Sequence, residues 1–557
     1  MPLIEKNKKI PSFQLSLNSL NLALAIWLGL VLNSAFYQKI NSLTPYTGLR
    51  AGLFIGTTML VIIAAYFLIF QLLHWRRSFK LLAVIWIILG GLASYFVNQL
   101  GIYINSEQIQ NGMQTDLQET LDLVTSQRLL IWALFFVLLP LLILSMVKIK
   151  KEPLKKSMLA KSINILLSLS IIGGSLYLFY VDYAAIFREN REIKNMISPQ
   201  NVLRASYSYY KHLKPQADQP IQPYGRDAHQ VVHTNRQTLP KLMIIVIGET
   251  ARAESFQLNG YARPTNPQLS KQNIIYFNQV SSCGTATAVS LPCMLSGMTR
   301  SSYEPQTARQ RENLLDIAKH AGYAVTWISN SSGCKEVCNR VENYQAPATV
   351  RQPWCDTNGE CKDDVLVDSL EAYLKQIPAT DQQPRLIVLH QMGSHGPAYY
   401  KRTTPEFVPF QPICSNSSIQ GCSQQALINT YDNSILYTDH ILNRVINTLK
   451  SNTRYQAAMW YVSDHGESTG EHGLYLHSAP YAIAPSQQTH IPMLSWFSAN
   501  WQQQNQQQVI CIQQQKNSPM SHDMLFPTLL HLMDIHSQTI NDQLDLSQQC
   551  TTNHHRA

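Results

Sequence analysis

The chain has 557 residues, of which 45% are hydrophobic and only 14% are charged, and its formal net charge is +9. This length allows several domains, and the charged fraction is well below the roughly 25% of ordinary soluble domains. Much of the positive charge comes from lysines that flank apolar runs, so it does not indicate a nucleic-acid-binding protein; a modestly basic surface would instead suit anionic lipid.

Five windows in the first third of the chain carry no charged residue. They are Ser16–Tyr37, Ala51–Leu73, Leu81–Tyr103, Leu129–Val147 and Ser162–Val181. Each has about the 17–25 residues that a membrane-spanning helix needs. One such window could be a buried helix of a soluble protein, but five in succession favour five spanning helices. We therefore expect a transmembrane domain over residues 1–190.

Lysine and arginine are unevenly distributed among the segments that flank these windows. The rich segments precede the first window, join the second to the third and join the fourth to the fifth: Lys6, Lys8 and Lys9, then Arg76, Arg77 and Lys80, then Lys148, Lys150, Lys151, Lys155, Lys156 and Lys161. The positive-inside rule places these segments and the N-terminus in the cytoplasm. Five spans then place everything after about residue 185 on the other side. The first window has no small-residue cleavage site and is expected to remain as an anchor.

Residues 191–240 are polar and contain several prolines, so we predict a linker with short helical pieces such as Asn201–Leu213. Over residues 241–557, short apolar runs alternate with amphipathic stretches, as in α/β domains. Four of these runs are typical of buried parallel strands: Leu242–Ile247, Tyr323–Ile328, Leu386–His390 and Ala457–Val462. The glutamine-rich stretch WQQQNQQQ at 501–508 predicts a mobile loop.

The stretch SSCGTATAVSLPC, Ser281 to Cys293, contains candidates for a reactive hydroxyl. Two cysteines flank the hydroxyl residues Thr285, Thr287 and Ser290. An alcohol is a weak nucleophile until a base or a metal activates it. Such a hydroxyl could be the fourth ligand of a metal, and a disulfide between the two cysteines would hold the loop rigid.

Each of the four predicted strands is followed by residues that can bind a metal or an anion. In chain order they are Glu249, Lys335, His395, and the group Asp464, His465 and Glu467. In an open parallel sheet, ligands bind just beyond the carboxyl ends of the strands. Carboxylates and imidazole suit zinc or manganese. Glu249 could instead cap a helix, and Asp464 could form a structural pair with His465, but their joint placement favours a metal site.

All ten cysteines lie at or after Cys283. An even number confined to the part beyond the last span predicts disulfides in an oxidising compartment. Neighbouring cysteines suggest the pairs Cys283–Cys293, Cys334–Cys338, Cys355–Cys361 and Cys414–Cys422, which leaves Cys511–Cys550, although connectivity does not follow from sequence. A cysteine-bound zinc is the alternative, but a paired CxxC pattern is lacking.

Four stretches, GETARAESFQLNGYARPTNP, SSCGTATAVSLPCMLSG, LHQMGSHGPAYYKR and SDHGESTGEHGLYLHSAPYAIAPSQQTHIPM, resemble the lipid A phosphoethanolamine transferases, which include the mobile colistin-resistance enzymes. The resemblance extends over nearly the whole chain. It implies an α-helical membrane domain of five spans followed by a disulfide-rich α/β domain of the alkaline-phosphatase-like, or sulfatase-like, fold. It also implies one tightly bound Zn²⁺, with a second left open, a nucleophile at Thr287, and Glu249, Asp464 and His465 as the other zinc ligands.

The resemblance assigns further residues to substrates. Lys335, His395 and His477 match positions that bind the phosphoryl group or a second metal, and Glu467 matches another position near that metal. Many relatives carry two asparagines in the loop before the lysine. This chain has Asn330 followed by Ser331, so the second substrate contact is a departure from the family.

A third set of residues lies between the third and fourth spans. Asn111, Thr115 and Glu119 fall at i, i+4 and i+8, on one face of a helix, and match residues that bind the head group of the donor lipid. A carboxylate suits the ethanolamine ammonium. Without the resemblance, a solvated amphipathic helix explains the same pattern equally well.

The resemblance implies a monomeric enzyme of the bacterial inner membrane with its catalytic domain in the periplasm. The expected reaction transfers phosphoethanolamine from phosphatidylethanolamine to a lipid A phosphate through a covalent intermediate on Thr287, which lowers the negative charge that polymyxins bind. Core sugars, glucans and pilins remain open as acceptors. A phosphoglycerol transferase shares the five spans and the threonine, but not the ten exported cysteines. A sulfatase would need a Cys-x-Pro-x-Arg-type site, which PCMLSG does not supply. A non-catalytic zinc-stabilised envelope protein would not need Thr287, so the presence of Thr287 together with all the ligands argues against that class.

Overall fold

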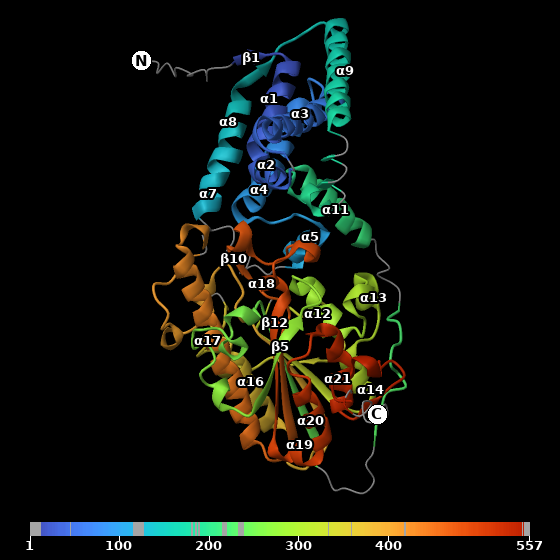
Figure 1. Cartoon of the computed structure of the whole chain (residues 1–557), viewed down its shortest axis with the longest axis vertical. Coiled ribbons are helices and arrows are strands. Elements are labelled where there is room, and N and C mark those ends of the chain that lie inside the picture. The colour runs from blue at the N-terminus through green and yellow to red at the C-terminus, as the bar shows by residue number, and fades with distance from the viewer. Residues whose placement is uncertain are drawn as a thin grey trace, which may run out of the picture. The chain divides into compact units, whose positions relative to one another are not determined.

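The structure is a computed structural model that describes residues 13–44, 46–114, 127–179, 182–183, 186–187, 190–213, 220–231, 239–331, 333–357, 359–416, 419–548 and 550 (Figure 1). The chain forms two compact units. The first comprises Met1–Ile109 and Val124–Tyr210, and the second comprises Gln110–Leu123 and Lys211–Ala557.

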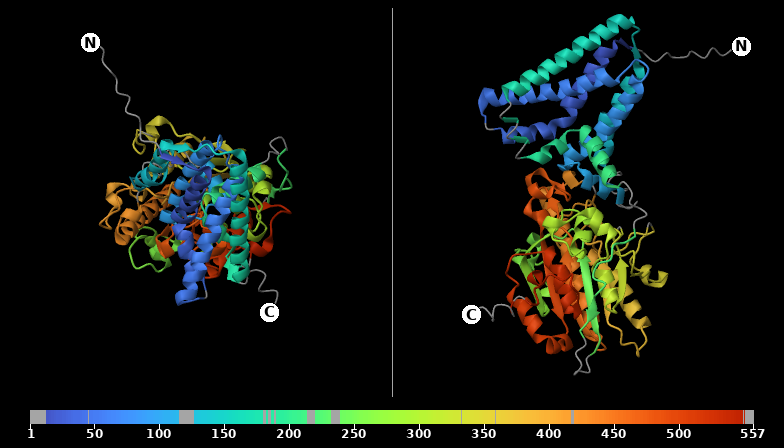
Figure 2. Two further views of the ribbon diagram at one scale, coloured as in Figure 1. Left: turned by 90° about the horizontal axis from the view of Figure 1, so that it is seen from above. Right: turned by 90° about the vertical axis from the view of Figure 1, so that its right-hand side faces the viewer.

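The first unit contains five helical segments that are long and apolar enough to cross a membrane (Figures 1 and 2). They are Leu17–Leu43 (α1, Leu17–Leu30, with α2, Ser34–Leu43), Gly48–Leu73 (α3), Phe79–Leu100 (α4), Gln127–Met146 (α7 with α8) and Leu154–Leu178 (α9). This confirms the five predicted spans. Many leucines of these helices are exposed, as lipid-facing side chains require. Two shorter helices lie where the sequence predicts helical structure. They are α5 (Ser106–Gln114) and α11 (Gln200–Leu213).

The second unit is built around an eight-stranded mixed sheet. Its order is β13-β5-β12-β9-β4-β8-β6-β7. The four predicted strands lie in its middle as β4 (Lys241–Gly248), β6 (Ala324–Ser329), β8 (Arg385–His390) and β9 (Gln456–Ser463), and they pair in parallel. Their aliphatic runs are buried because both faces of the sheet are covered. Figure 1 shows α16 (Asp364–Gln376) and α17 (Gln424–Ser451) on one side and α14 (Leu314–His320) and α21 (Leu525–Leu532) on the other.

One further strand, β12, gives the sheet its mixed character. β12 (His490–Phe497) runs antiparallel to both β9 and β5 (Ile274–Ser281). The edges are completed by two-residue strands, β13 (Met520–Ser521) and β7 (Glu342–Asn343).

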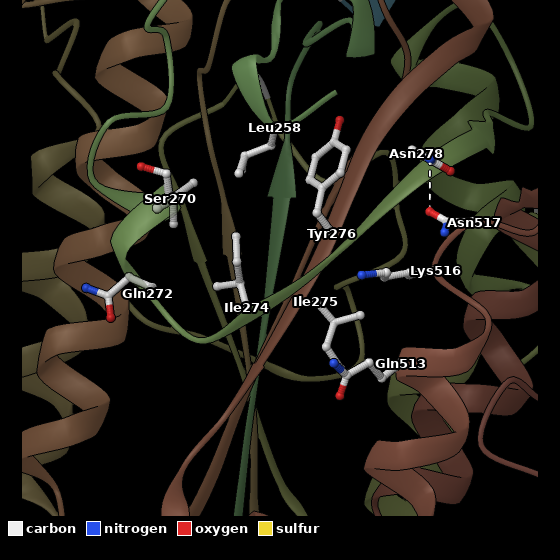
Figure 3. Close-up of a pocket in the computed structure, with 11 residues that line it drawn as sticks. Leu258, Ser270, Gln272, Ile274, Ile275, Tyr276, Asn278, Gln513, Lys516 and Asn517 are labelled. Atoms are coloured by element: carbon white, nitrogen blue, oxygen red, sulfur yellow. Dashed lines mark hydrogen bonds between the residues drawn. The ribbon is translucent and has the colours of Figure 1, made fainter. Parts of the chain in front are cut away.

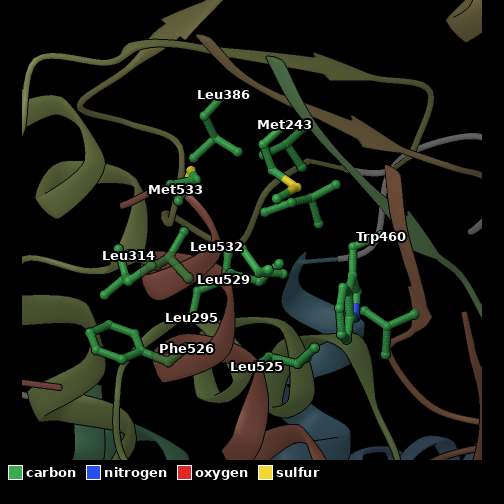
Figure 4. Close-up of a cluster of buried hydrophobic side chains, with 14 of the residues drawn as sticks. Met243, Leu295, Leu314, Leu386, Trp460, Leu525, Phe526, Leu529, Leu532 and Met533 are labelled. Carbon is green, nitrogen blue, oxygen red and sulfur yellow. The ribbon is translucent and has the colours of Figure 1, made fainter. Parts of the chain in front are cut away.

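A single apolar cluster fixes one face of the sheet to its helices (Figure 4). Met243, Leu386 and Trp460 from three adjacent strands pack against helical side chains that include Leu295 of α12 (Thr287–Leu295) and Leu529 of α21. Burial of each such side chain contributes about 1.5–3 kcal/mol. The stretch Ser281–Cys293, which we call the nucleophile stretch after the predicted role of Thr287, runs into α12. It is therefore attached to the sheet by the apolar side of that helix.

The glutamine-rich stretch at 501–508 is not the predicted mobile loop. It forms α19 (Ala499–Gln504) and α20 (Gln506–Gln514). Glutamine has a good intrinsic helix propensity. Ser498 caps α19 by accepting the Trp501 N–H, and the Trp501 side chain is fully buried in the core. The polar composition of the stretch gave no indication that Trp501 would be buried in the core.

All ten cysteines form disulfides in the five pairs that sequence proximity suggests: Cys283–Cys293, Cys334–Cys338, Cys355–Cys361, Cys414–Cys422 and Cys511–Cys550. This arrangement rules out a cysteine-bound zinc. Four pairs close short local loops, and the fifth joins residues 39 positions apart.

Loop length predicts which disulfide stabilises the fold most. Replacing Cys511 and Cys550 together by serine should lower the free energy of unfolding by ~4 kcal/mol, against ~2 kcal/mol for Cys334 and Cys338, because a longer closed loop restricts the unfolded chain more. Thermal unfolding of the two double variants in one detergent measures the difference. An equal or reversed order would contradict the chain-entropy argument, and titration of free thiols in the unreduced protein should find none.

Candidate metal centre and active site

The site begins where two adjacent parallel strands end together. Gly248 of β4 lies in register with Ser463 of β9, so the residues that follow, Glu249 and Asp464, emerge side by side. The Thr250 N–H donates to Asp464 Oδ1 over 3.1 Å, and Thr250 has a left-handed φ of 59°. A β-branched residue rarely adopts that conformation, and such strain concentrates at functional sites.

Three side chains at these strand ends converge. One ligand atom from each of Glu249, Asp464 and His465 lies within 4.8 Å of the others, and all three residues are buried. His465 Nε2 is 3.5 Å from Glu249 Oε1 and 3.4 Å from Asp464 Oδ2. No α-helix begins after Glu249, only a short 3₁₀ turn at Ala253–Ser255, so Glu249 does not cap a helix.

Of the three hydroxyl residues in the nucleophile stretch, Thr287 faces this group. Its Oγ1 lies 3.0 Å and 3.2 Å from the two Glu249 carboxylate oxygens and 3.3 Å from His465 Nε2. Thr285 and Ser290 instead donate to the main-chain carbonyls of Ala479 and Asp464. Thr287 is the first residue of α12, where backbone N–H groups lack helical partners and favour an anion.

The donor set fits a zinc ion. The Gly466 carbonyl accepts from His465 Nδ1–H over 2.9 Å, which leaves Nε2 with its lone pair toward the carboxylates. Asp464 Oδ2 is buried and has no hydrogen-bond partner among the described residues. Two carboxylates, one imidazole and one hydroxyl oxygen supply the four positions of a tetrahedral zinc site. The metal prediction therefore agrees with the charges and the unsatisfied atom of the pocket.

Burial disfavours charge in this pocket. It raises the pKa of Asp464 to about 7, and it raises that of Glu249 well above its ordinary value, with the Asp464 charge as the second cause. Burial, followed by the neighbouring His477, lowers the pKa of His465 to about 4. A bound cation would favour ionisation of both carboxylates and would keep the imidazole neutral, as a metal ligand must be.

A second group lies next to the first. The His477 ring centroid is 4.6 Å from that of His465 and 5.1 Å from that of His395. Glu467 Oε2 lies 2.9 Å from His477 Nδ1, and the Tyr399 hydroxyl donates to its other oxygen. Burial raises the pKa of Glu467 to about 8 and lowers that of His477 to about 4.

The loop after β6 carries the other predicted substrate contacts. Lys335 has a left-handed φ of 47°, and its Nζ donates to the Gln114 carbonyl over 3.2 Å. The Asn330 amide donates to the Cys361 carbonyl and to Asp363, so it holds the scaffold, and Ser331 is half-buried beside it. Substrate binding by Asn330 and Ser331 remains a prediction.

The predicted donor-lipid residues lie only partly within the described chain. Asn111 is in α5, one residue after Gln110, whose side chain donates to the Ala288 carbonyl over 3.4 Å. Thr115 and Glu119 lie outside the described residues. The end of α5 thus reaches the residue that follows Thr287.

Sequence reasoning missed His522, which connects the nucleophile loop to the metal group. Its Nδ1 accepts the Cys283 N–H over 3.1 Å, and its Nε2 lies 3.0 Å from the Ser463 carbonyl, to which it donates. His522 is buried and follows the two-residue strand β13, which leaves no periodic signal in the sequence. His390 was also missed, and its Nε2 lies 4.0 Å from Glu249 Oε2.

A separate cavity of ≈ 320 Å³ lies along β5 and is unrelated to this site (Figure 3). Its lining includes Ile274, Tyr276 and Lys516 and none of the converging residues described above.

Two family models match the chain. The sulfatase model matches residues 241–535, and the model described as phosphoethanolamine transferase EptA/EptB matches residues 62–213. The chain is 39% identical over 551 residues to phosphoethanolamine transferase EptA of Escherichia coli K12, covering 98% of this chain and 99% of that protein. It is 33% identical to phosphatidylethanolamine transferase Mcr-1 of Escherichia coli, covering 94% and 95%.

A solved structure resembles the chain over almost its full length. It is the integral membrane lipooligosaccharide phosphoethanolamine transferase A of Neisseria meningitidis, with a TM-score of 0.90, 36% identity, and coverage of 96% of this chain and 99% of that one. The soluble domain of that protein, solved separately, is 42% identical and covers 59% of this chain, with a TM-score of 0.56.

The pKa shifts predict how metal binding depends on pH. The folded, metal-free protein retains carboxyl protons that the unfolded chain has lost above about pH 4, so its stability falls as pH rises toward about 7. Zinc requires the ionised carboxylates. The rise in unfolding temperature on adding zinc should therefore be larger at about pH 7.5 than at about pH 5.5.

The matched variant is Asp464→Asn. It removes one of the two buried carboxylates that repel each other, so it should stabilise the metal-free protein at neutral pH while abolishing the zinc-dependent shift. A full zinc shift in this variant would show that the metal binds elsewhere.

Proposed function

The chain belongs to the phosphoethanolamine transferase family, and from that premise we propose that it moves phosphoethanolamine from phosphatidylethanolamine to a lipid A phosphate with zinc as cofactor. The observation that carries the proposal is the contact of the Thr287 hydroxyl with Glu249 and His465 in a buried pocket. An alcohol in that position can act as a nucleophile, because a carboxylate accepts its proton.

Zinc held by Glu249, Asp464, His465 and the Thr287 oxygen would lower the pKa of that hydroxyl when bound. In the first half-reaction, Thr287 Oγ1 forms a bond to the donor phosphorus and the bond from phosphorus to the diacylglycerol oxygen breaks. The threonine proton passes to a basic group of the site, and the diacylglycerol oxygen takes up a proton from such a group or from water as it leaves. In the second, an oxygen of the lipid A phosphate attacks the same phosphorus, and Thr287 regains its hydroxyl.

The neighbouring groups suit the charge on the transferred phosphoryl group. Lys335 supplies a positive charge, and preorganised donors of this kind stabilise the extra negative charge of the transition state. Burial keeps His477 and His395 neutral by lowering the pKa of each, so they act as hydrogen-bonding groups rather than as fixed cations. A second metal stays open, and the cluster with Glu467 is where we would look for it.

Three features support a location in the inner membrane with the catalytic domain in the periplasm. They are the five apolar helices, the lysine-rich segments on one side, and the oxidised cysteines of the second unit. Every group of the site comes from one chain, so we expect a monomer to be active.

The product would carry less negative charge, which would weaken the binding of cationic polymyxins. Similarity to Mcr-1, named a phosphatidylethanolamine transferase, supports the donor, and similarity to a lipooligosaccharide phosphoethanolamine transferase supports a lipopolysaccharide-type acceptor over glucans or pilins. Within that class we propose a lipid A phosphate rather than a core sugar. Mass spectrometry of lipid A from cells with and without this gene tests the acceptor. If lipid A is unchanged and a core sugar is modified, the acceptor is the core sugar and not lipid A.

Thr287→Ala should abolish transfer, and trapped wild-type protein should carry phosphoethanolamine on Thr287. The change removes only one small hydroxyl at the start of α12, so the unfolding temperature should be nearly unchanged. Peptide mapping after incubation with phosphatidylethanolamine locates the modification. Thr285→Val is the control, since its hydroxyl donates to a main-chain carbonyl; modification mapped to Thr285 would refute the assignment.

Glu119→Ala should lower lipid transfer roughly tenfold to a hundredfold, because a charge-assisted hydrogen bond to the donor ammonium contributes ~1.5–3 kcal/mol. Hydrolysis of a small soluble phosphoester and zinc content should stay unchanged. Both activities are measured on one purified variant. An equal loss of both would mean that Glu119 acts through folding, and full lipid transfer would mean that it does not contact the donor.

A further inference from the structure

The loop that carries His395 is held at its far end by a buried arginine. The His395 carbonyl accepts from Arg402 Nε over 2.8 Å. Only 4% of the Arg402 side chain is exposed, and its guanidinium also forms an ion pair with Glu360, which is 10% exposed. His395 is therefore connected through Arg402 to a carboxylate from a different part of the chain.

The near end of the same loop is held by a second acid. Asp363 accepts the N–H groups of Met392 and Gly393, both over 2.9 Å. Gly393 has a φ of +56°, and a Cβ there would lie 2.5 Å from the Glu249 carbonyl oxygen, so only glycine fits. The Ser394 N–H donates to that same carbonyl over 3.0 Å. The loop thus passes against the backbone of a proposed zinc ligand.

Both acids lie within four consecutive residues, Glu360 to Asp363, beside a disulfide. Cys355–Cys361 closes the loop that presents Glu360. The Asn330 amide joins the Cys361 carbonyl, at 3.0 Å, to Asp363 Oδ1, at 2.8 Å. We call residues 355–363 the disulfide clasp. The clasp contacts the chain on both sides of His395.

From this geometry we propose that Arg402 and Glu360 are positioning residues, which use the disulfide clasp to fix His395 against the transferred phosphoryl group. The inference rests on the proposed function, since it assigns His395 to that group. The clasp acts through the backbone: it sets where the His395 ring lies and takes no part in the bond changes.

Two physical arguments favour positioning over simple stabilisation. A buried ion pair is a weak source of stability, because the desolvation of both charges offsets their attraction, and well-packed apolar residues would serve as well. A guanidinium, however, has a planar fork of donors that fixes direction as well as distance. Direction matters here, because a displacement of about 1 Å at a reacting group can cost about a hundredfold in rate.

The test is a double-mutant cycle between the clasp and His395. Arg402→Gln and His395→Ala should each lower kcat for lipid transfer about tenfold to a hundredfold, and the double variant should be no more than about threefold slower than His395→Ala alone. Arg402→Lys should recover part of the loss. Glu360→Gln, and Cys355→Ser with Cys361→Ser, should lower kcat about tenfold with KM for the donor unchanged.

Matched controls come from equivalent bonds elsewhere in the second unit. Asp381→Asn breaks an ion pair with the buried Arg385 at the opposite end of β8 from His390, and Cys414→Ser with Cys422→Ser opens another short loop. Both should retain wild-type transfer. Losses as large as those of the clasp variants would show that general stability explains the effect and would overturn the inference.

Two other results would also overturn it. In the first, the double variant loses activity by the product of the losses of Arg402→Gln and His395→Ala, which would mean that the two residues act independently. In the second, His395→Ala keeps full activity. Failure of the proposed function is distinguishable, because it would appear as absent diacylglycerol release from phosphatidylethanolamine by the wild-type protein. In that case the same cycle is measured on hydrolysis of a small soluble phosphodiester, which does not depend on the lipid donor.

Discussion

The whole site depends on two carboxylates, those of Glu249 and Asp464, that are buried side by side at the ends of adjacent strands. Neither is exposed by more than 2%, burial raises the pKa of both, and the charge of Asp464 raises that of Glu249 further. Without a cation such a pair costs stability, because two like charges of this kind cannot both ionise in a dry pocket. The arrangement becomes favourable only when a positive charge occupies the space between them. A bound cation would therefore suit the electrostatics of this pocket as well as the chemistry proposed for transfer.

The surrounding structure resists the relaxation that would relieve this repulsion. The Thr250 and His465 N–H groups hold Asp464 Oδ1 at 3.1 Å and 2.7 Å, and the strained φ of Thr250 is maintained because β4 and β9 are paired along their full length. His522 ties the nucleophile loop to the carbonyl just before Asp464. The apolar side of α12 anchors Thr287 to the core. Strand pairing, a buried histidine and a packed helix thus converge on one small volume, so residues that lie far apart in the sequence fix the Thr287 hydroxyl beside Glu249 and His465.

Much of this could be predicted from the sequence, and the omissions have a common cause. The central strands were visible because both faces are covered, which produces continuous apolar runs, and the ligands followed because parallel strands end at one edge. The reversed strand β12 was not identified as such, because direction is set by partners and not by its own composition. His522, Arg402 and Asp363 could not be identified for the same reason: each acts through a contact with a backbone group at least seven residues away, and nothing local marks it. Their positions emerge only from the tertiary fold.

A transferase on a hydrolase-like fold must favour a lipid phosphate over water as the second nucleophile. The second unit includes the segment that begins at Gln110, and this segment contacts two parts of the site. Gln110 donates to the carbonyl next to Thr287, and the Gln114 carbonyl accepts from Lys335. One segment therefore contacts both α12 and Lys335, and wherever water is excluded between such groups, charge interactions are strengthened. In the sequence, this segment follows the third membrane-spanning helix, which ends at Leu100, and belongs to the second unit from Gln110 onward.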